Sequence, residues 1–340
     1  MVLINEHHVF VIAELSANHN GSLNVAIRSI EEAARCGVDA VKFQTYTADT
    51  LTINHDGPGF VIDGGLWDGR KLHELYQEAF TPWEWHERLF EVARECGLVC
   101  FSSPFDASAV DLLEGLGNPI YKIASFEITD IPLIEYAASK GKPMVISTGI
   151  ATDEEIVDAL DACRRMGNNE VTLLKCTSAY PAPIEDANLK TMVDMRTRYG
   201  VETGLSDHTT GHSVAVAAVA LGATMVEKHF ILDRSMGGVD SAFSMEPAEF
   251  KLMVEEIRKT EAALGVVDYD LTEKKKGARQ FARSLYVVKD IAAGEVFTSE
   301  NVRSIRPGYG LPPKYLKDVL GKTAVESVSK GSPLSRIHFR

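Results

Sequence analysis

Two lysines stand at the ends of short apolar runs, where a parallel sheet would bring them to one edge. Lys42 follows the run that begins at Ala40, and Lys122 lies in the run that begins at Ile120, with Ser125 just beyond it. Two ammonium groups in a mouth of low dielectric would repel each other, so an anionic ligand explains the pair. The pair therefore predicts an electropositive, hydroxyl-rich pocket that binds phosphate and carboxylate groups.

Two histidines end later apolar runs and could bind a divalent metal. His208 and His229 would be neighbours if their strands are successive strands of one barrel. Imidazole pairs of this kind bind divalent cations and leave positions open for water and a substrate oxygen. Taken alone, the pair could equally form buried hydrogen bonds, and His19 and His212 are competing candidates.

The other apolar runs also end in polar residues. A single charged residue at such a place usually forms a salt bridge or a polar layer. Lys175 and Lys228 are interpreted in that way, as structural partners of Glu14 or Glu227. The polar residues at the ends of the runs are Glu14, Lys42, Gln44, Ser102, Ser103, Lys122, Ser125, Ser147, Thr148, Lys175, Ser178, Ser206, Asp207, His208, Glu227, Lys228 and His229.

The runs themselves alternate with helical patterns through the first three quarters of the chain. Near-continuous hydrophobicity is typical of strands buried on both faces. Eight such units favour a closed (β/α)8 TIM barrel, whose active-site residues come from the carboxyl ends of the strands. No GxGxxG or Walker loop supports an open sheet. The predicted strands are Val9–Ala13, Ala40–Phe43, Leu98–Phe101, Ile120–Ala124, Met144–Ile146, Val171–Leu174, Val201–Leu205 and Thr224–Val226.

Helical periodicity fills the gaps, and the pattern changes after the barrel. An apolar stripe runs from Leu23 to Ala34, with Gly37 where that helix would end, and further helices are predicted over Pro82–Cys96 and Pro247–Leu264. These patterns predict a barrel domain over residues 1–267, a solvated basic linker over 268–280 and a small β-rich domain over 281–340. The strands predicted in the small domain are Ser284–Asp290, Gly294–Phe297, Val302–Pro307, Gly321–Val325 and Gly331–Leu334.

The composition limits the partners of the chain. The formal net charge of −13 disfavours a general nucleic-acid or anionic-membrane surface, because such surfaces require a basic face. The five cysteines include no CxxC pair, so neither a disulfide framework nor a zinc ribbon is indicated. The first apolar run is too short for a signal peptide and no run approaches a membrane span, so we expect a cytoplasmic protein.

The most specific stretches are short motifs spread along the chain. They are Ala13-Glu-Leu-Ser-Ala-Asn-His-Asn-Gly21, Val41-Lys-Phe-Gln-Thr45, Gly65-Leu-Trp-Asp68, Phe101-Ser-Ser-Pro-Phe105, Lys122-Ile-Ala-Ser-Phe-Glu127, Gly204-Leu-Ser-Asp-His208, Glu227-Lys-His-Phe230, Arg283-Ser-Leu-Tyr286 and Arg306-Pro-Gly308. Over essentially the whole chain they resemble the bacterial sialic acid synthase family, and within it most the subgroup that makes pseudaminic acid. The last two resemble the antifreeze-like (SAF) domain of that family.

The resemblance implies a reaction and its binding residues. Phosphoenolpyruvate would condense with an N-acetylated amino-sugar aldehyde, here 2,4-diacetamido-2,4,6-trideoxy-L-altrose, and with water, to give a nine-carbon α-keto acid and phosphate by carbon–oxygen cleavage. His208 and His229 would hold Mn²⁺ or Mg²⁺. The residues implied to bind phosphoenolpyruvate are Lys42, Lys122, Ser125, Ser178 and Ser206.

The resemblance also implies the sugar site and the assembly. Glu14 would orient a sugar hydroxyl or move a proton. Sialic acid synthases tend to carry asparagine at the position of Ser178, whereas the pseudaminic subgroup resembles this chain there. A domain-swapped homodimer is implied, in which Arg306 of the antifreeze-like domain reaches the partner's barrel mouth; the alternative is an ordinary surface arginine. The residues implied to face the sugar are Gln44, Phe105, Tyr180, Asp240 and Arg306.

Two alternatives stay open. The same chemistry on another sugar would give N-acetylneuraminate or legionaminate, because a pocket discriminates against one small group by only about a hundredfold. A non-catalytic carbohydrate- or ice-binding protein is suggested by the small β-rich domain alone. Glu14, the two lysines and the two histidines argue against this second alternative.

Overall fold

A computed structural model describes residues 8–340, which form two compact units, one ending at Gly265 and the other beginning at Val266. The first unit confirms the predicted (β/α)8 barrel. Its eight parallel strands pair in chain order, and the first pairs with the last to close the sheet. The strands are β1 (Phe10–Glu14), β2 (Ala40–Thr45), β3 (Val99–Pro104), β4 (Tyr121–Ile123), β5 (Met144–Ser147), β6 (Val171–Cys176), β7 (Glu202–Asp207) and β8 (Met225–His229).

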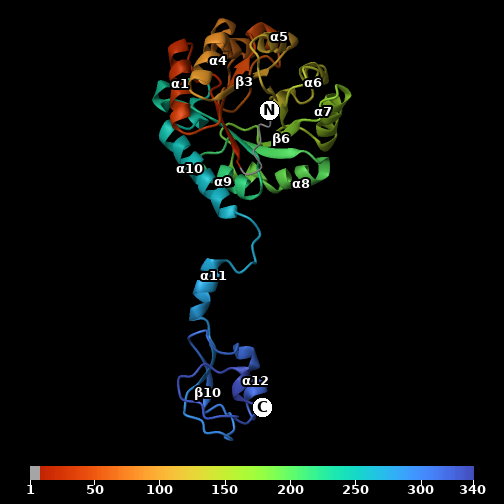
Figure 1. Cartoon of the computed structure of the whole chain (residues 1–340). Helices are drawn as coiled ribbons and strands as arrows, with labels where there is room; N and C mark the ends of the chain where they lie inside the picture. Colours follow the sequence, from red (N-terminus) through yellow and green to blue (C-terminus); the bar gives the residue numbers. More distant parts are fainter. Residues whose placement is uncertain (1–7) are drawn as a thin grey trace. The chain divides into compact units, whose positions relative to one another are not determined.

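Helices surround the strands as an outer ring (Figure 1). A large apolar core lies between these helices and the strands, and it includes Ile30, Leu89 and Phe250. The helices of this unit are α1 (Leu23–Arg35), α2 (Ala48–Leu51), α3 (Leu72–Ala79), α4 (His86–Glu95), α5 (Ala107–Gly115), α6 (Ile131–Ala138), α7 (Asp153–Arg165), α8 (Lys190–Tyr199), α9 (Ser213–Ala220) and α10 (Pro247–Leu264).

Local sequence explains where the helices begin and end. The Ser22 hydroxyl accepts a hydrogen bond from the Val25 N–H at the start of α1, and Gly37 takes a positive φ of 83° just after its end. The prediction of one continuous helix over Pro82–Cys96 was wrong at its start. A 3₁₀ turn at Trp83–Trp85 precedes α4.

A second, smaller apolar cluster fills the interior of the barrel. Strand residues point alternately into the barrel and away from it, so every second residue of a strand faces the interior. These interior residues are apolar along the strand and polar at its carboxyl end, where a barrel of this kind places its active site. In β1 these interior residues are Phe10, Ile12 and Glu14, all buried. The interior cluster comprises Phe10, Ile12, Ala40, Phe101, Ile120, Val145, Leu174 and Met225.

The second unit has its own apolar core, which includes Leu285, Phe297 and Leu334. Two antiparallel strands, β9 (Ser284–Val287) and β10 (Val302–Ile305), form its regular sheet. The other predicted strands were wrong as strands, because their residues pair through single bridges such as Val296 with Thr323. Glycines with positive φ at positions 294, 321 and 331 turn the backbone too often for longer ladders.

The segment predicted as a basic linker contains the short helix α11 (Glu273–Ala278), and its residues are exposed. A further short helix, α12 (Leu316–Val319), lies in the second unit. Within residues 8–340, every helix is too short or too polar to cross a membrane.

The close packing inside the barrel yields a stability prediction at Gly204. A Cβ atom there would lie 2.4 Å from the Met225 carbonyl oxygen and 2.8 Å from Leu174 Cδ2. We expect Gly204→Ala to destabilise the barrel by about 1–3 kcal/mol, measured as a lower melting temperature. Gly115→Ala is the matched control, because its Cβ would meet nothing within 4 Å. Equal melting temperatures for the two variants would contradict this account of the interior.

Candidate active site

A small polar cavity of about 60 Å³, which we call the floor, lies at the carboxyl ends of the strands. It brings together most of the residues predicted from the sequence. Ser178 does not line it but donates a hydrogen bond to Ser125, Oγ to Oγ, at 2.9 Å. The residues that line the floor are Glu14, Lys42, Gln44, Lys122, Ala124, Ser125, Ser147, Cys176, Tyr180, Ser206, His208, Glu227 and His229.

Lys42 is the most strongly paired cation of the floor. Its buried ammonium forms ion pairs with Glu14 and, at 3.6 Å, with Glu227. The Ser206 hydroxyl donates to Glu227 Oε1 at 2.8 Å. The argument that repulsion between the two lysines requires an anionic ligand was therefore wrong. Two glutamates of the protein already supply negative charge beside these lysines.

The two glutamates differ in their protonation. Burial raises the pKa of Glu14 to about 7, and Lys42 offsets only part of that shift. Burial alone would also raise the pKa of Glu227, but Lys122 and Lys42 hold it below its usual value. Glu227 is thus a fixed anion near neutral pH, whereas Glu14 can gain or lose a proton there.

Lys122 is the lysine of the floor that can meet an added anion. Its ammonium donates to Ser147 Oγ at 2.7 Å and to the Ile123 carbonyl at 2.9 Å. Among the described residues it forms no ion pair, and burial lowers its pKa. A phosphate or carboxylate placed here would meet a buried cation flanked by hydroxyl groups.

The two predicted metal ligands are adjacent. The ring centroids of His208 and His229 lie 5.3 Å apart, and both side chains are buried. His208 Nδ1 lies 3.0 Å from the Thr177 carbonyl, a hydrogen bond that places the proton on Nδ1 and leaves the lone pair on Nε2. Burial, with His208 and two lysines nearby, lowers the pKa of His229 well below its usual value.

These histidines fit a divalent metal. His229 Nδ1 is buried without a hydrogen-bond partner and lies 3.8 Å from Asp240 Oδ2. Neutral imidazoles with available lone pairs are the form that metals bind. The described residues contain no cluster of three or more His, Cys, Asp or Glu side chains with metal-binding geometry. Two protein ligands would therefore leave positions for water and substrate.

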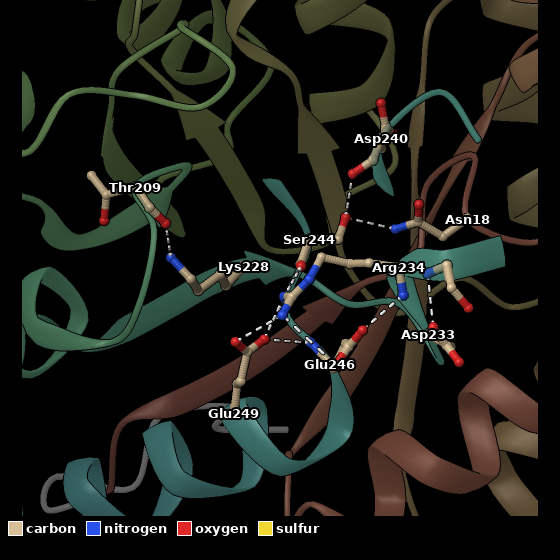
Figure 2. A network of polar contacts seen from close by, with 10 residues as sticks. Asn18, Thr209, Lys228, Asp233, Arg234, Asp240, Ser244, Glu246 and Glu249 are labelled. Carbon is tan, nitrogen blue, oxygen red and sulfur yellow. Dashed lines mark hydrogen bonds and ion pairs between the residues drawn. The ribbon is translucent and has the colours of Figure 1, made fainter. Parts of the chain in front are cut away.

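Lys228 does not pair with Glu14 or Glu227, so that prediction was wrong. Its ammonium donates to Asp207 Oδ2 and to the Thr209 carbonyl, each at 2.6 Å (Figure 2). Alternation along β7 and β8 is the reason: Asp207 and Lys228 point outward between residues that line the floor. The other lysine taken as structural, Lys175, donates to the Cys176 carbonyl and to Thr177, not to a carboxylate.

The strand ends are braced from outside as well. Arg234, in the loop after β8, forms two hydrogen bonds to the carboxylate of Glu249 in α10, and its backbone N–H donates to Glu246 (Figure 2). Asn18 donates to Ser244 Oγ at 2.8 Å. The same hydroxyl donates to the carbonyl of Asp240 at 2.7 Å, so this network fixes the backbone that carries Asp240.

A larger cavity of about 330 Å³, which we call the chamber, adjoins the floor and shares Gln44, Ala124, Ser125, Tyr180 and His229 with it. The predicted sugar-facing residues Phe105 and Asp240 line it too. Most of its wall was missed from the sequence, because it comes from segments beyond the strand ends: the loops after β1 and β8, the β2–α3 connection with α3 itself, and the turn after β4. The missed residues are Ser16, Ala17, Tyr46, Leu51, Ile62, Trp67, Leu75, Tyr76, Ala79, Phe126, Glu127, Val239 and Phe243.

Three predicted or competing residues lie elsewhere. Arg306 belongs to the second unit, and its role at a barrel mouth stays a prediction. The competing histidines are not beside the metal pair: His19 contacts Thr81 and packs against Trp85, and His212 precedes α9. Glu227 was named from the sequence only as a strand-end residue and a possible partner of Lys175 or Lys228, although its alternation with His229 in β8 could have placed it in the floor.

Known proteins resemble this chain in sequence and fold. The NeuB family model matches residues 29–269 and the SAF domain model residues 282–339. Pseudaminic acid synthase of Campylobacter jejuni strain 81-176 is 50% identical over 98% of this chain and 97% of its own. N,N'-diacetyllegionaminic acid synthase of C. jejuni strain NCTC 11168 is 37% identical over 93% and 96%. The structure of N-acetylneuraminic acid (sialic acid) synthetase from Leptospira borgpetersenii is 31% identical, with a TM-score of 0.72 over 80% of this chain and 90% of that one.

The geometry of the histidine pair predicts the effect of removing one ligand. His229→Ala should abolish binding of Mn²⁺, measured by calorimetry or electron paramagnetic resonance, together with metal-dependent turnover. The fold should persist, because His229 Nδ1 makes no hydrogen bond that the variant would lose. His212→Ala is the control and should bind Mn²⁺ as the parent does. Unchanged Mn²⁺ affinity in His229→Ala would remove the metal assignment.

Proposed function

The chain belongs to the NeuB family, and we propose that it condenses phosphoenolpyruvate with 2,4-diacetamido-2,4,6-trideoxy-L-altrose and water to give pseudaminic acid and phosphate. The observation that carries the proposal is 50% identity to a pseudaminic acid synthase over nearly the full length of both chains. The diacetyllegionaminic acid synthase is more distant, at 37%. A non-catalytic binding role would leave the buried charges of the floor unexplained.

Phosphoenolpyruvate suits the floor because it carries two anionic groups and little bulk. Lys122, with hydroxyls of Ser125 and Ser147 beside it, supplies a buried positive site for phosphate or carboxylate. Ser178 supports Ser125 through their hydrogen bond, and Lys42 adds positive charge from the other side. A preorganised donor of this kind contributes about 3 kcal/mol when charge develops on the leaving phosphate.

We propose that His208 and His229 hold Mn²⁺ or Mg²⁺. The fit rests on their adjacency, on the unpartnered nitrogen of His229 and on the neutral state of that imidazole. When bound, the metal supplies a Lewis acid that polarises the aldehyde of the open-chain sugar.

The reaction then forms one carbon–carbon bond and breaks one carbon–oxygen bond. The methylene carbon of phosphoenolpyruvate attacks the aldehyde carbon, whose oxygen takes up a proton and becomes a hydroxyl. Water adds to the neighbouring carbon of phosphoenolpyruvate and loses one proton, and phosphate then leaves with the bridging oxygen while the added hydroxyl loses its proton to become the keto group. The two protons of water thus balance the one taken up by the new sugar hydroxyl and the one carried away by phosphate. Glu14, with a pKa of about 7, accepts the proton that the water releases, while Glu227 stays ionised and keeps Lys42 charged.

The second unit has a proposed role in an assembly. We propose that two copies form a domain-swapped homodimer in which Arg306 of one copy reaches the sugar at the barrel mouth of the other. Support comes from the match of residues 282–339 to the SAF domain and from the family resemblance of Arg306-Pro-Gly308.

Product identification tests the function. The full-length protein is depleted of metal, restored with Mn²⁺ and given phosphoenolpyruvate with either the diacetamido-trideoxy-altrose or N-acetylmannosamine. Metal-dependent release of phosphate with the first sugar, and a product identified as pseudaminic acid by nuclear magnetic resonance, are expected. A higher kcat/KM for N-acetylmannosamine would reject the proposed acceptor. No release of phosphate with either sugar and any added metal would reject the reaction.

The pKa of Glu14 predicts a pH dependence. Because this carboxyl loses its proton as the pH rises through about 7, and the ionised form accepts the proton from water, kcat should rise between about pH 6 and pH 8. Glu14→Gln should lower kcat by about 10²–10⁴-fold and flatten that limb of the profile. If kcat of the Glu14→Gln variant still rose with pH near pH 7, the ionisation would belong to another group.

A further inference from the structure

Three buried polar side chains, which we call the outer network, lie behind β2 and β3 and take no part in the proposed reaction. The hydroxyl of Thr45, the last residue of β2, lies 2.8 Å from His86 Nε2 and 2.6 Å from Ser102 Oγ. All three side chains are fully buried. Alternation along β2 places Thr45 on the side opposite to Gln44, which lines the floor. The outer network therefore backs the floor from outside the barrel.

The hydrogen bonds of the outer network run in one direction. His86 Nδ1 lies 3.2 Å from the Pro82 carbonyl, which can only accept, so Nδ1 carries the proton and Nε2 keeps its lone pair. Burial lowers the pKa of His86, which keeps the ring neutral near pH 7. Thr45 therefore donates to Nε2, and its oxygen accepts a hydrogen bond from Ser102. A buried network whose members are all satisfied holds one arrangement of its groups.

The turn that presents His86 is itself fixed to the neighbouring strand ends. His19 Nδ1 accepts a hydrogen bond from the Gly21 N–H at 3.1 Å, so its Nε2 donates to Thr81 Oγ1 at 3.3 Å. Trp83 Nε1 donates to the Tyr46 carbonyl at 3.2 Å. The turn before α4 is thus tied to the loop after β1 and to the residue that follows β2.

The strand ends behind which the outer network lies carry groups of the floor. A long connection with α2 and α3 separates Thr45 from His86 in the sequence, so the outer network, rather than a short turn, holds the end of β2. Lys42 of the same strand donates to Ser103 Oγ at 3.3 Å, and the strand register pairs Gln44 with Ser103. A shift of the ends of β2 and β3 would displace Lys42 and Gln44 together.

We propose that His86 is a positioning residue, which acts through Thr45 to hold the end of β2 so that Gln44 and Lys42 keep their places at the reacting carbons. The inference rests on the proposed function, because its consequences are measured on that reaction. Lys122, the lysine that can meet an added anion, belongs to β4. We therefore expect loss of the outer network to lower kcat while the KM for phosphoenolpyruvate changes little.

An isosteric pair of variants at Thr45 tests this role in the full chain. Thr45→Val removes the hydroxyl and fits a strand, whereas Thr45→Ser keeps the hydroxyl. Well below the melting temperature, kcat should fall about 10–100-fold in Thr45→Val and stay within about threefold of the parent in Thr45→Ser. The KM for phosphoenolpyruvate should stay within about threefold in both variants.

Thr203→Val is the matched control for Thr45→Val. Thr203 is a buried threonine of β7, and its hydroxyl has no hydrogen-bond partner among the residues that the structure describes. The same change of side chain at this position should leave kcat and KM at the parental values. A comparable loss of kcat in Thr203→Val would assign the effect to the substitution itself and overturn the inference.

A double variant shows whether His86 acts through Thr45. His86→Phe removes both ring nitrogens and keeps an aromatic ring. Because both single variants break the same hydrogen bond, kcat of His86→Phe/Thr45→Val should lie within about threefold of the lower single value. Affinity for Mn²⁺, measured by calorimetry, should match the parent in every variant, because the histidine pair belongs to β7 and β8. Weakened Mn²⁺ binding would show a general disturbance of the barrel and overturn the local role.

The outcomes separate this inference from the proposed function. If the parent makes pseudaminic acid and Thr45→Val melts at a lower temperature but keeps the parental kcat, the inference fails and the function stands. Equal losses in Thr45→Val and Thr45→Ser, or independent losses in the double variant, would also overturn it. If His86→Phe does not fold, as judged by circular dichroism, the Thr45 pair still decides the question. Failure of the parent to turn over the diacetamido sugar would instead overturn the proposed function.

Discussion

A buried ammonium group, that of Lys42, joins three strands at the point where the barrel closes. Its partners Glu14 and Glu227 come from β1 and β8, which pair only because the first strand meets the last. A charge removed from water must be paired, and leaving one partner out costs several kcal/mol, so closure of the sheet and neutralisation of the floor depend on each other. Lys122, the serines and the two histidines are arranged around this centre.

Alternation along the strands separates the groups that do chemistry from those that hold them. Glu227 and His229 line the floor from β8, while Lys228 between them points outward to Asp207 of β7. A hydrogen-bonded ion pair on the outer side thus ties together the two strand ends that carry the histidines. Arg234 and Asn18 brace the loop that follows (Figure 2). Rigid support of this kind keeps ligand geometry fixed, which catalysis by preorganised groups requires.

The mouth has two compartments of different character, and the difference suits two unlike substrates. The floor is small and charged, whereas the chamber is several times larger and mostly apolar, with a few polar groups. Phosphoenolpyruvate is small and anionic, while an acetamido sugar without a terminal hydroxyl is larger and presents methyl groups. His229 and Ser125 border both compartments, so the reacting carbons of the two substrates can meet there.

The sequence by itself determined the barrel and most of the floor. Strands buried on both faces leave a continuous apolar signal, and the polar residues that end them must gather at one edge of a parallel barrel; Lys42, Lys122, His208 and His229 were found in this way. Tertiary structure alone decided which charges pair, as with Lys228 and Asp207, because alternation sets the side of the strand on which a residue lies, whereas strand pairing and register set which neighbour it meets there. It also decided the chamber. Trp67, Phe243 and Glu127 reach it from connections without periodicity, and only folding brings those connections over the strand ends.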